Sequence, residues 1–162
     1  MKPNHFTTIP VQAAIITVSS TRTRENDTSG KAILDILNGA GIPVKHYTIV
    51  HDQIEAIRYE VYNAMKTSNC IILNGGTGLT HDDCTIEAIA PLLDKKIDGF
   101  GELFRMLSFQ EIGSAAMLSR ANAGIKDGKA IFCIPGSTGA VTLATSALII
   151  PEITHILTHA NK

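Results

Sequence analysis

The sequence predicts an α/β fold of three layers, α/β/α, around a mostly parallel, mixed sheet. Three observations predict it. Strand-like apolar runs alternate with helix-like segments, glycine-rich loops follow several of these runs, and one Asp-Gly pair separates two adjacent runs. Repeated strand–loop–helix units indicate right-handed crossovers and parallel strands between layers of helices. The Asp-Gly pair favours a hairpin, which adds an antiparallel strand.

The first half of the chain contains three strand-like runs with helices between them. Val11–Val18 is nearly continuously apolar, which is typical of a strand covered on both faces. Thr28–Ala40 is predicted to be a helix, because its apolar residues recur at helical spacing and glycines mark its end. Val44–Val50 is the second predicted strand, an apolar face from Ile54 to Met65 predicts the second helix, and Cys70–Asn74 is the third strand.

The second half of the chain combines helices with the predicted hairpin. Apolar residues at helical spacing predict helices around Ile86–Leu93 and Phe100–Leu107. Asp127-Gly128 then lies between two short strand-like runs. The remaining predicted elements are the strands Ala121–Lys126 and Lys129–Ile134 and the helices Thr138–Ile149 and Pro151–Thr158, the last with proline as its first residue.

The composition indicates one globular domain, residues 11–162, after a flexible N-terminal segment of residues 1–10. The net charge of −1, from 14 basic and 15 acidic residues, argues against nucleic acid or an anionic membrane as a partner. No apolar run approaches the ~20 residues of a membrane helix, and no N-terminal apolar stretch indicates a signal peptide. Three cysteines without a CxxC pair favour a reduced, cytoplasmic protein.

The polar constellations of the sequence lie in the loops that follow the predicted strands. These loops are Ser19–Asp27, His51–Gln53, Gly75–Asp83 and Pro135–Gly139. In sheets of this kind, ligands bind beyond the carboxyl ends of the strands. We therefore expect the binding site at that edge of the sheet.

Two of these loops are rich in glycine. Gly75, Gly76, Thr77 and Gly78 follow a buried strand and precede a helix, an arrangement that turns backbone N–H groups toward one phosphate; the alternative is a tight structural turn. In the second loop, which is Pro135, Gly136 and Ser137, the serine hydroxyl either binds a phosphate or only caps the next helix. Two such loops in one sheet favour a ligand with several phosphates.

Carboxylates lie beside these loops. Asp52, with Glu55 three residues later, fits a capping box, and Asp82 and Asp83 would cap the third helix. The alternative is a functional role. Carboxylates repel phosphates, and a divalent cation between them removes this repulsion. On that interpretation, Asp52 holds Mg²⁺ or a polar edge of the ligand, and a divalent cation lies between the phosphates and Asp82 and Asp83.

Ordered motifs across nearly the whole chain resemble the molybdenum cofactor biosynthesis family that includes MoaB, MogA and the gephyrin G domain. Linked segments at 104–109 and 118–121 are most similar to the MoaB branch. The motifs are Thr17–Ser19, Asp27–Gly30, Ile72–Thr80 with Asp83 and Thr85–Ala88, Gly99–Arg105, and Pro135–Ser137.

The resemblance implies a function and an assembly. It implies a homotrimer or a homohexamer that binds molybdopterin, a pterin dithiolene monophosphate. It also implies Mg²⁺-dependent transfer of an adenylyl group from ATP to molybdopterin, with release of pyrophosphate and delivery of the product to a molybdate-inserting enzyme. The alternatives are a binding protein of the same fold that does not adenylylate molybdopterin, and an interaction scaffold.

The resemblance also implies roles for particular residues. Asp83 would hold Mg²⁺ and the reacting phosphates, and Asp52 would help to hold Mg²⁺–ATP. The first glycine loop would bind nucleotide phosphates, Ser137 with Gly136 would bind the pterin phosphate, and Ser19 would line the same pocket. Two departures from the family pattern bear on these roles. Asn74 stands where a threonine is common, and His81–Asp82 replaces an arginine-rich lead into the aspartate of MogA-like members.

Overall fold

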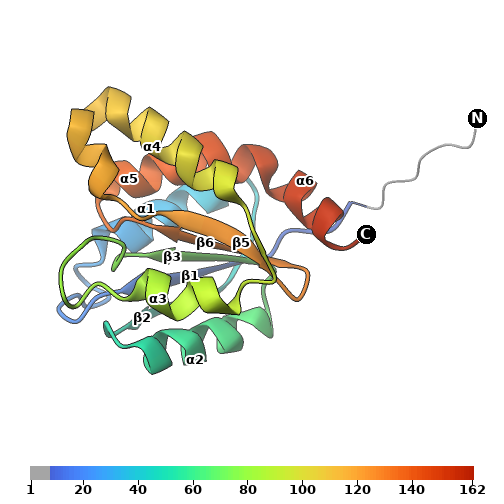
Figure 1. Cartoon of the computed structure of the whole chain (residues 1–162). Helices are drawn as coiled ribbons and strands as arrows, with labels where there is room; N and C mark the ends of the chain where they lie inside the picture. Colours follow the sequence, from blue (N-terminus) through green and yellow to red (C-terminus); the bar gives the residue numbers. More distant parts are fainter. Residues whose placement is uncertain (1–7) are drawn as a thin grey trace, which may run out of the picture.

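A six-stranded mixed sheet forms the centre of the molecule, with the strand order β2-β1-β3-β6-β5-β4 (Figure 1). We describe residues 8–162 of a computed structural model, so the predicted flexible segment lies largely outside the described residues. The strands β2, β1, β3 and β6 run parallel, whereas β5 and β4 are antiparallel to their neighbours. The strands are β1 (Ala13–Val18), β2 (Val44–Val50), β3 (Cys70–Asn74), β4 (Lys95–Lys96), β5 (Asn122–Lys126) and β6 (Lys129–Ile134).

Helices cover both faces of the sheet, which confirms the predicted three layers. In Figure 1, α1, α4, α5 and α6 lie above the sheet, and α2 and α3 lie below it. The α-helices are α1 (Thr28–Gly39), α2 (Ile54–Met65), α3 (Thr85–Ile89), α4 (Asp98–Ile112), α5 (Thr138–Ala144) and α6 (Ile150–Ala160). Short segments of other helix types are η1 (Ala90–Leu92), η2 (Gly113–Leu118) and η3 (Thr145–Ile149).

The strands divide their side chains between two apolar cores. In β1, Ile15 packs with α1, α4, α5 and α6, whereas the next residue, Ile16, packs with α2 and α3. Ile72 and Ile71 of β3 divide in the same way. Because alternate residues of a strand face opposite sides, a run buried on both faces is nearly continuously apolar. All six residues of β1 are buried accordingly.

The Asp-Gly turn forms the predicted hairpin between β5 and β6. Asp127 and Gly128 have φ angles of 49° and 74°, as a type I′ turn requires. Lys126 pairs with Lys129 across the turn. The hairpin adds β5 as an antiparallel strand and leaves the carboxyl end of β6 beside that of β3.

The predicted break before Pro151 is wrong, because α5, η3 and α6 form one continuous helix. The segment η3 is a π-helical turn in which the N–H of Ile150 bonds to Thr145 O. A π-turn changes the hydrogen-bond ladder locally, and Pro151, which has no N–H to donate, lies two residues after it. By length and mean hydropathy alone, the helix Thr138–Ala160 could cross a membrane, contrary to the expectation from the sequence. Its buried side chains pack in the core instead, among them Val141 and Leu157.

Two short elements depart from the predicted pattern. The edge strand β4 has two exposed lysines and no apolar alternation, so nothing in the sequence indicates it. Charged residues on an edge strand oppose pairing with another chain. The third predicted helix ends after five residues as α3, and the 3₁₀ segment η1, which contains Pro91, continues it. Neither departure moves the carboxyl edge of the sheet.

Candidate functional site

The two glycine-rich loops lie in contact at the carboxyl ends of β3 and β6. These strands pair in parallel, so their following loops leave the sheet side by side. The N–H of Gly75 donates to Ile134 O at 2.9 Å. A Cβ atom placed on Gly136 would lie 3.2 Å from the Cα of Gly75. The sheet therefore joins the predicted loops into one site.

Only glycine fits at the first two positions of the loop after β3. Gly75 and Gly76 have φ angles of 104° and 70°, which L side chains rarely adopt. A Cβ on Gly75 would lie 2.3 Å from Val18 O, and one on Gly76 would lie 2.3 Å from Thr85 Oγ1. The hydroxyl of Thr85 donates to Gly75 O at 2.7 Å, so the start of α3 fixes the turn.

A cavity of about 410 Å³ opens over both loops. Polar backbone from the two loops forms one part of its wall, and apolar side chains from α4 and η2 form the other. A phosphate-bearing ring system requires such a combination of N–H donors and apolar surface. The lining residues are Gly75, Gly76, Thr77, Gly78, Asp83, Phe104, Ser108, Ile112, Ala115, Ala116, Leu118, Ser119, Pro135, Gly136, Ser137 and Ala140.

The two predicted aspartates flank the first glycine loop. Asp52 Oδ1 lies 3.4 Å from the position that a Cβ on Gly76 would take, and Asp83 Oδ2 lies 2.7 Å from the corresponding position on Gly78. Ser20 Oγ donates to Asp52 Oδ2 at 2.9 Å. The N–H and hydroxyl of Thr80 both donate to Asp83 Oδ2, at 3.0 and 2.8 Å. The two carboxylates therefore lie beside the same loop, Asp52 near Gly76 and Asp83 near Gly78.

Neither aspartate caps a helix, so the structural alternative from the sequence is wrong for both. The N-cap residues of α2 and α3 are Gln53 and Cys84, and neither makes a side-chain cap hydrogen bond. Throughout residues 8–162, Oδ1 of Asp52 and Oδ1 of Asp83 accept no hydrogen bond from the protein. Each carboxylate thus keeps one oxygen for a ligand.

Carboxylate oxygens of this kind suit Mg²⁺, which binds one or two carboxylates and completes its shell with water and phosphate oxygens. The described residues contain no group of three or more His, Cys, Asp and Glu side chains that could hold a metal ion by themselves. A metal at Asp52 and Asp83 would therefore depend on oxygens from a ligand. That dependence is the arrangement expected for a metal that arrives with nucleotide phosphates.

The serine of the second loop does cap its helix. Ser137 Oγ accepts from the N–H of Ala140 at 3.2 Å, and α5 begins at the next residue. A hydroxyl that accepts one hydrogen bond can still donate its own hydrogen. The cap therefore holds Ser137 at the cavity wall without using its donor.

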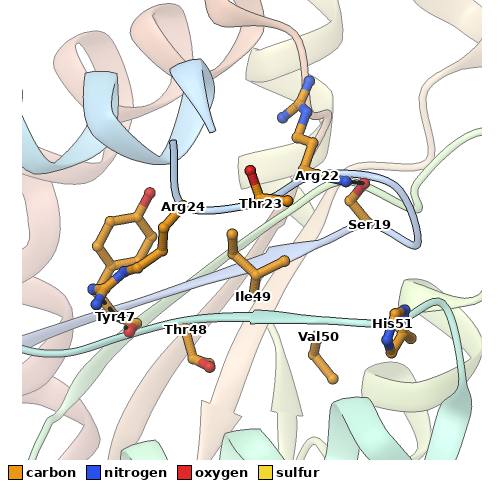
Figure 2. A pocket seen from close by; sticks show the side chains of 9 residues that line it. All are labelled: Ser19, Arg22, Thr23, Arg24, Tyr47, Thr48, Ile49, Val50 and His51. Carbon is orange, nitrogen blue, oxygen red and sulfur yellow. Dashed lines mark hydrogen bonds between the residues drawn. The ribbon is translucent and has the colours of Figure 1, made fainter. Parts of the chain in front are cut away.

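Ser19 lies in a second cavity, of about 360 Å³, rather than in the first. Figure 2 shows this cavity between β2 and the loop after β1, with Tyr47 and Ile49 directed toward that loop. Ser19 Oγ accepts from the N–H of Thr21 and of Arg22, so it mainly shapes the loop. The lining residues are Ser19, Arg22, Thr23, Arg24, Tyr47, Thr48, Ile49, Val50 and His51.

The family profile described as "Probable molybdopterin binding domain" matches residues 14–155. The chain belongs to the MoaB/MogA family of molybdenum cofactor biosynthesis proteins. The match includes both glycine loops and both aspartates.

Relatives place the chain in the MoaB branch of the MoaB/MogA family, as its linked motifs indicate. It is 50% identical over 150 residues to molybdenum cofactor biosynthesis protein B of Halalkalibacterium halodurans, covering 91% of this chain and 88% of that protein. A crystal structure of a molybdenum cofactor biosynthesis protein B matches with a TM-score of 0.91 and 47% identity, over 95% of this chain and 98% of that one. The tungsten cofactor synthesizing protein MoaB from Pyrococcus furiosus matches with a TM-score of 0.86 and 36% identity, over 94% and 98%.

A buried polar network beneath the loops contains residues that the sequence did not single out. The carboxylate of Asp27 is fully buried and accepts from Thr17 Oγ1 at 2.7 Å and from the hydroxyl of Tyr47. Burial and this hydrogen bond to a carboxylate both raise the pKa of Tyr47. Arg22 lies 3.7 Å from Asp27 and donates to Gly136 O at 3.2 Å. The network therefore joins the loop after β1 to the second glycine loop.

Asn74, which departs from the MoaB/MogA pattern, belongs to the same network. Its Nδ2 donates to Thr17 Oγ1 at 2.9 Å, and its Oδ1 accepts from Ser29 Oγ at 2.8 Å. A threonine has one hydroxyl and can replace only part of this pair of hydrogen bonds. The signals for the network in the sequence were the family motifs Thr17–Ser19 and Asp27–Gly30 and the departure at Asn74, which indicate positions and not partners.

Proposed function

We propose that this protein transfers an adenylyl group from ATP to molybdopterin in a reaction that depends on Mg²⁺ and releases pyrophosphate. One observation carries the proposal: Asp52 and Asp83 flank the first glycine loop, and each keeps one oxygen without a hydrogen bond. Phosphoryl transfer asks the protein chiefly to position its substrates and to neutralise charge. The residues at this edge of the sheet suit both tasks.

The bond changes involve only the substrates. A phosphate oxygen of molybdopterin forms a bond to the α-phosphorus of ATP, the bond from that phosphorus to the α,β-bridging oxygen breaks, and pyrophosphate leaves with the electron pair. Mg²⁺, when bound, offsets the negative charge on the reacting phosphates and on pyrophosphate. Asp52 and Asp83 would hold this ion through their Oδ1 oxygens.

The loops would hold the two phosphate groups that react. Backbone N–H groups of residues 75–78 would bind the nucleotide phosphates. Ser137, with Pro135 and Gly136, would bind the phosphate of molybdopterin, and the apolar wall from α4 and η2 would lie against the rest of that substrate. Ser19 would contact the substrates from the second cavity, where Arg22 and Arg24 add positive charge.

We propose further that the protein is a cytoplasmic homotrimer or homohexamer that passes its product to a molybdate-inserting enzyme. Support for the assembly comes from α4 and η2, which expose a group of large apolar side chains. Large exposed apolar patches mark contact surfaces. These residues are Leu103, Met106, Phe109, Ile112, Met117 and Leu118.

The assay is formation of adenylyl-molybdopterin and pyrophosphate from molybdopterin, ATP and Mg²⁺. We expect Asp83→Asn to keep the fold and to lose most turnover, because an amide keeps the shape of the side chain but not its charge. Asp98→Asn, at the first turn of α4, is the matched control and should turn over like the parent. Turnover of Asp83→Asn at the parental rate would disprove the metal role of this residue.

A binding protein without turnover is the second candidate. One observation favours it: His81 and Asp82 occupy the loop where MogA-like members carry arginines, so positive charge close to the phosphates is reduced. The same assay separates the candidates. A protein that retains molybdopterin but leaves ATP intact in the presence of Mg²⁺ is the binding protein, and stoichiometric pyrophosphate release excludes this candidate.

A further inference from the structure

Arg120 fastens the first glycine loop from outside the cavity. This residue lies between η2 and β5, more than 35 residues from the loop in sequence. Its backbone N–H donates to Thr77 O at 3.1 Å, and its Nε donates to Gly78 O at 3.0 Å. One terminal nitrogen donates to Asp83 O at 3.4 Å. A single residue thus binds the carbonyl groups at both ends of the segment from Thr77 to Asp83.

These contacts determine which way the peptide groups of the loop face. The C=O and N–H of a trans peptide point in opposite directions, and the described residues contain no cis peptide bond. With the carbonyl groups of Thr77 and Gly78 held by Arg120, the N–H groups of Gly78 and Leu79 point away from it. An anion needs N–H donors and is repelled by carbonyl oxygens, so this orientation favours phosphate.

Arg120 is itself held on two sides. Both terminal nitrogens of its guanidinium donate to the carboxylate of Glu87 in α3, and this interaction lowers the pKa of Glu87. Arg105 of α4 donates to the carbonyl groups of the neighbouring residues, Ser119 O at 3.4 Å and Ala121 O at 2.9 Å. The sequence assigned Arg105 no role inside the chain, but it supports the segment that carries Arg120.

The position of Arg120 also bears on charge. Its guanidinium donates to the backbone oxygen of Asp83, directly beside the loop. The side chain of Arg120 is 31% exposed, so water screens its charge only in part. Because Glu87 pairs with this guanidinium, Arg120 acts on the loop chiefly through its hydrogen bonds and not through net positive charge.

We propose that Arg120 is a positioning residue for adenylyl transfer: it orients the N–H groups of the loop between Thr77 and Asp83 toward the phosphates of the nucleotide. The expected effect on KM rests on the proposed function. The orientation of the loop does not, because it can be measured without turnover.

The test compares Arg120→Gln and Arg120→Lys with Arg58→Gln. Arg58 is a matched control, because its side chain is 29% exposed and also donates to two backbone carbonyl groups, Ala88 O and Glu87 O, but away from the loop. We expect Arg120→Gln, which removes the side-chain hydrogen bonds to the loop, to raise the KM for ATP by about tenfold or more, a factor equivalent to one charge-assisted hydrogen bond. The same change should weaken binding of inorganic pyrophosphate. Arg120→Lys, which keeps the charge but donates in fewer directions, should recover part of the loss.

Hydrogen exchange of the amides in residues 77–83 is the second readout. We expect it to be faster in Arg120→Gln than in the parent and unchanged in Arg58→Gln. Equal KM, pyrophosphate affinity and exchange rates in Arg120→Gln and Arg58→Gln would overturn the inference.

If the parent shows no turnover, the proposed adenylylation fails. Faster exchange and weaker pyrophosphate binding in Arg120→Gln would then still support the positioning role, and unchanged values would overturn it. Should Arg120→Gln not fold, the same measurements on Arg120→Lys decide the question.

Discussion

Removal of the Asp27 carboxylate tests the buried network that supports the loops. In Asp27→Ala, the N–H of Gly30 loses its N-cap acceptor, which lies at 3.1 Å, and such a loss costs about 1 kcal/mol. The buried hydroxyl of Thr17 loses the acceptor of its hydrogen, at about 1–3 kcal/mol. Tyr47 is partly exposed, so water can replace the carboxylate there. Arg22 loses its ion pair with Asp27 but keeps its hydrogen bond to Gly136 O, and with that loss included we expect a total of roughly 3–5 kcal/mol.

The assay is thermal and urea unfolding at one fixed protein concentration, because assembly would couple stability to concentration. For a domain of this size, the expected loss lowers Tm by about 6–20 °C. Tyr47→Phe removes one hydroxyl and should cost about 1 kcal/mol. Asp35→Ala, on the exposed side of α1, should stay within about 0.5 kcal/mol of the parent. A loss below about 1 kcal/mol in Asp27→Ala would refute the estimate, since the network would then contribute little.

Three further predictions concern the loop, the thiols and the exposed apolar surface. Gly76→Val should abolish ATP binding in a folded protein, because its Cβ would meet a hydroxyl of α3 at 2.3 Å; calorimetry that finds parental affinity would make the loop structural only. Under native conditions a thiol reagent should label only Cys84, slowly at pH 8 and faster as the pH rises, because burial and nearby carboxylates raise its pKa; Cys70, whose pKa burial raises to about 12, and Cys133 should react only after unfolding. Phe109→Glu, at an exposed position of α4, should shift the oligomer toward monomer in sedimentation, and an unchanged mass would move the subunit contact elsewhere.

The central strands β1 and β3 could be predicted from sequence because nearly all of their residues are buried and apolar. Val44–Val50 and Cys70–Asn74 have the predicted bounds in the structure. The edge strand β4 could not be predicted, since two exposed lysines carry no pattern and the strand depends on pairing with β5. The continuous C-terminal helix could not be predicted either, because the feature that allows it leaves no mark in the sequence. Pro151 is a local signal to break a helix, and the π-turn before it is visible only in the hydrogen bonds.

In the candidate site too, residues whose role depends on the nearby sequence could be predicted, and residues whose role depends on distant contacts could not. The glycines at 75 and 76 could be identified from sequence, because the turn that needs them is local and their φ angles are positive. Asp52 and Asp83 were ambiguous between capping and metal binding, because a capping motif depends on spacing while the actual partners, Ser20 and Thr80, depend on loop geometry. For Arg120 the only signal was its place in the family segment 118–121, which does not reveal partners more than 30 residues away.

Because glycine makes a loop flexible, the loop after β3 needs contacts from distant parts of the chain to hold its conformation. Gly75, Gly76 and Gly78 avoid side chains that would collide with neighbouring atoms of the protein. Each glycine also widens the set of backbone conformations that the unbound loop can adopt. A loop that binds phosphate through oriented N–H groups must have those conformations restricted before the ligand arrives, or binding carries the ordering cost. Thr85 restricts the loop at its start and Arg120 along its length, both through carbonyl groups that the ligand does not use. The open cavity and the fixed loop are therefore compatible because the contacts that restrain the backbone lie on the side opposite the substrate.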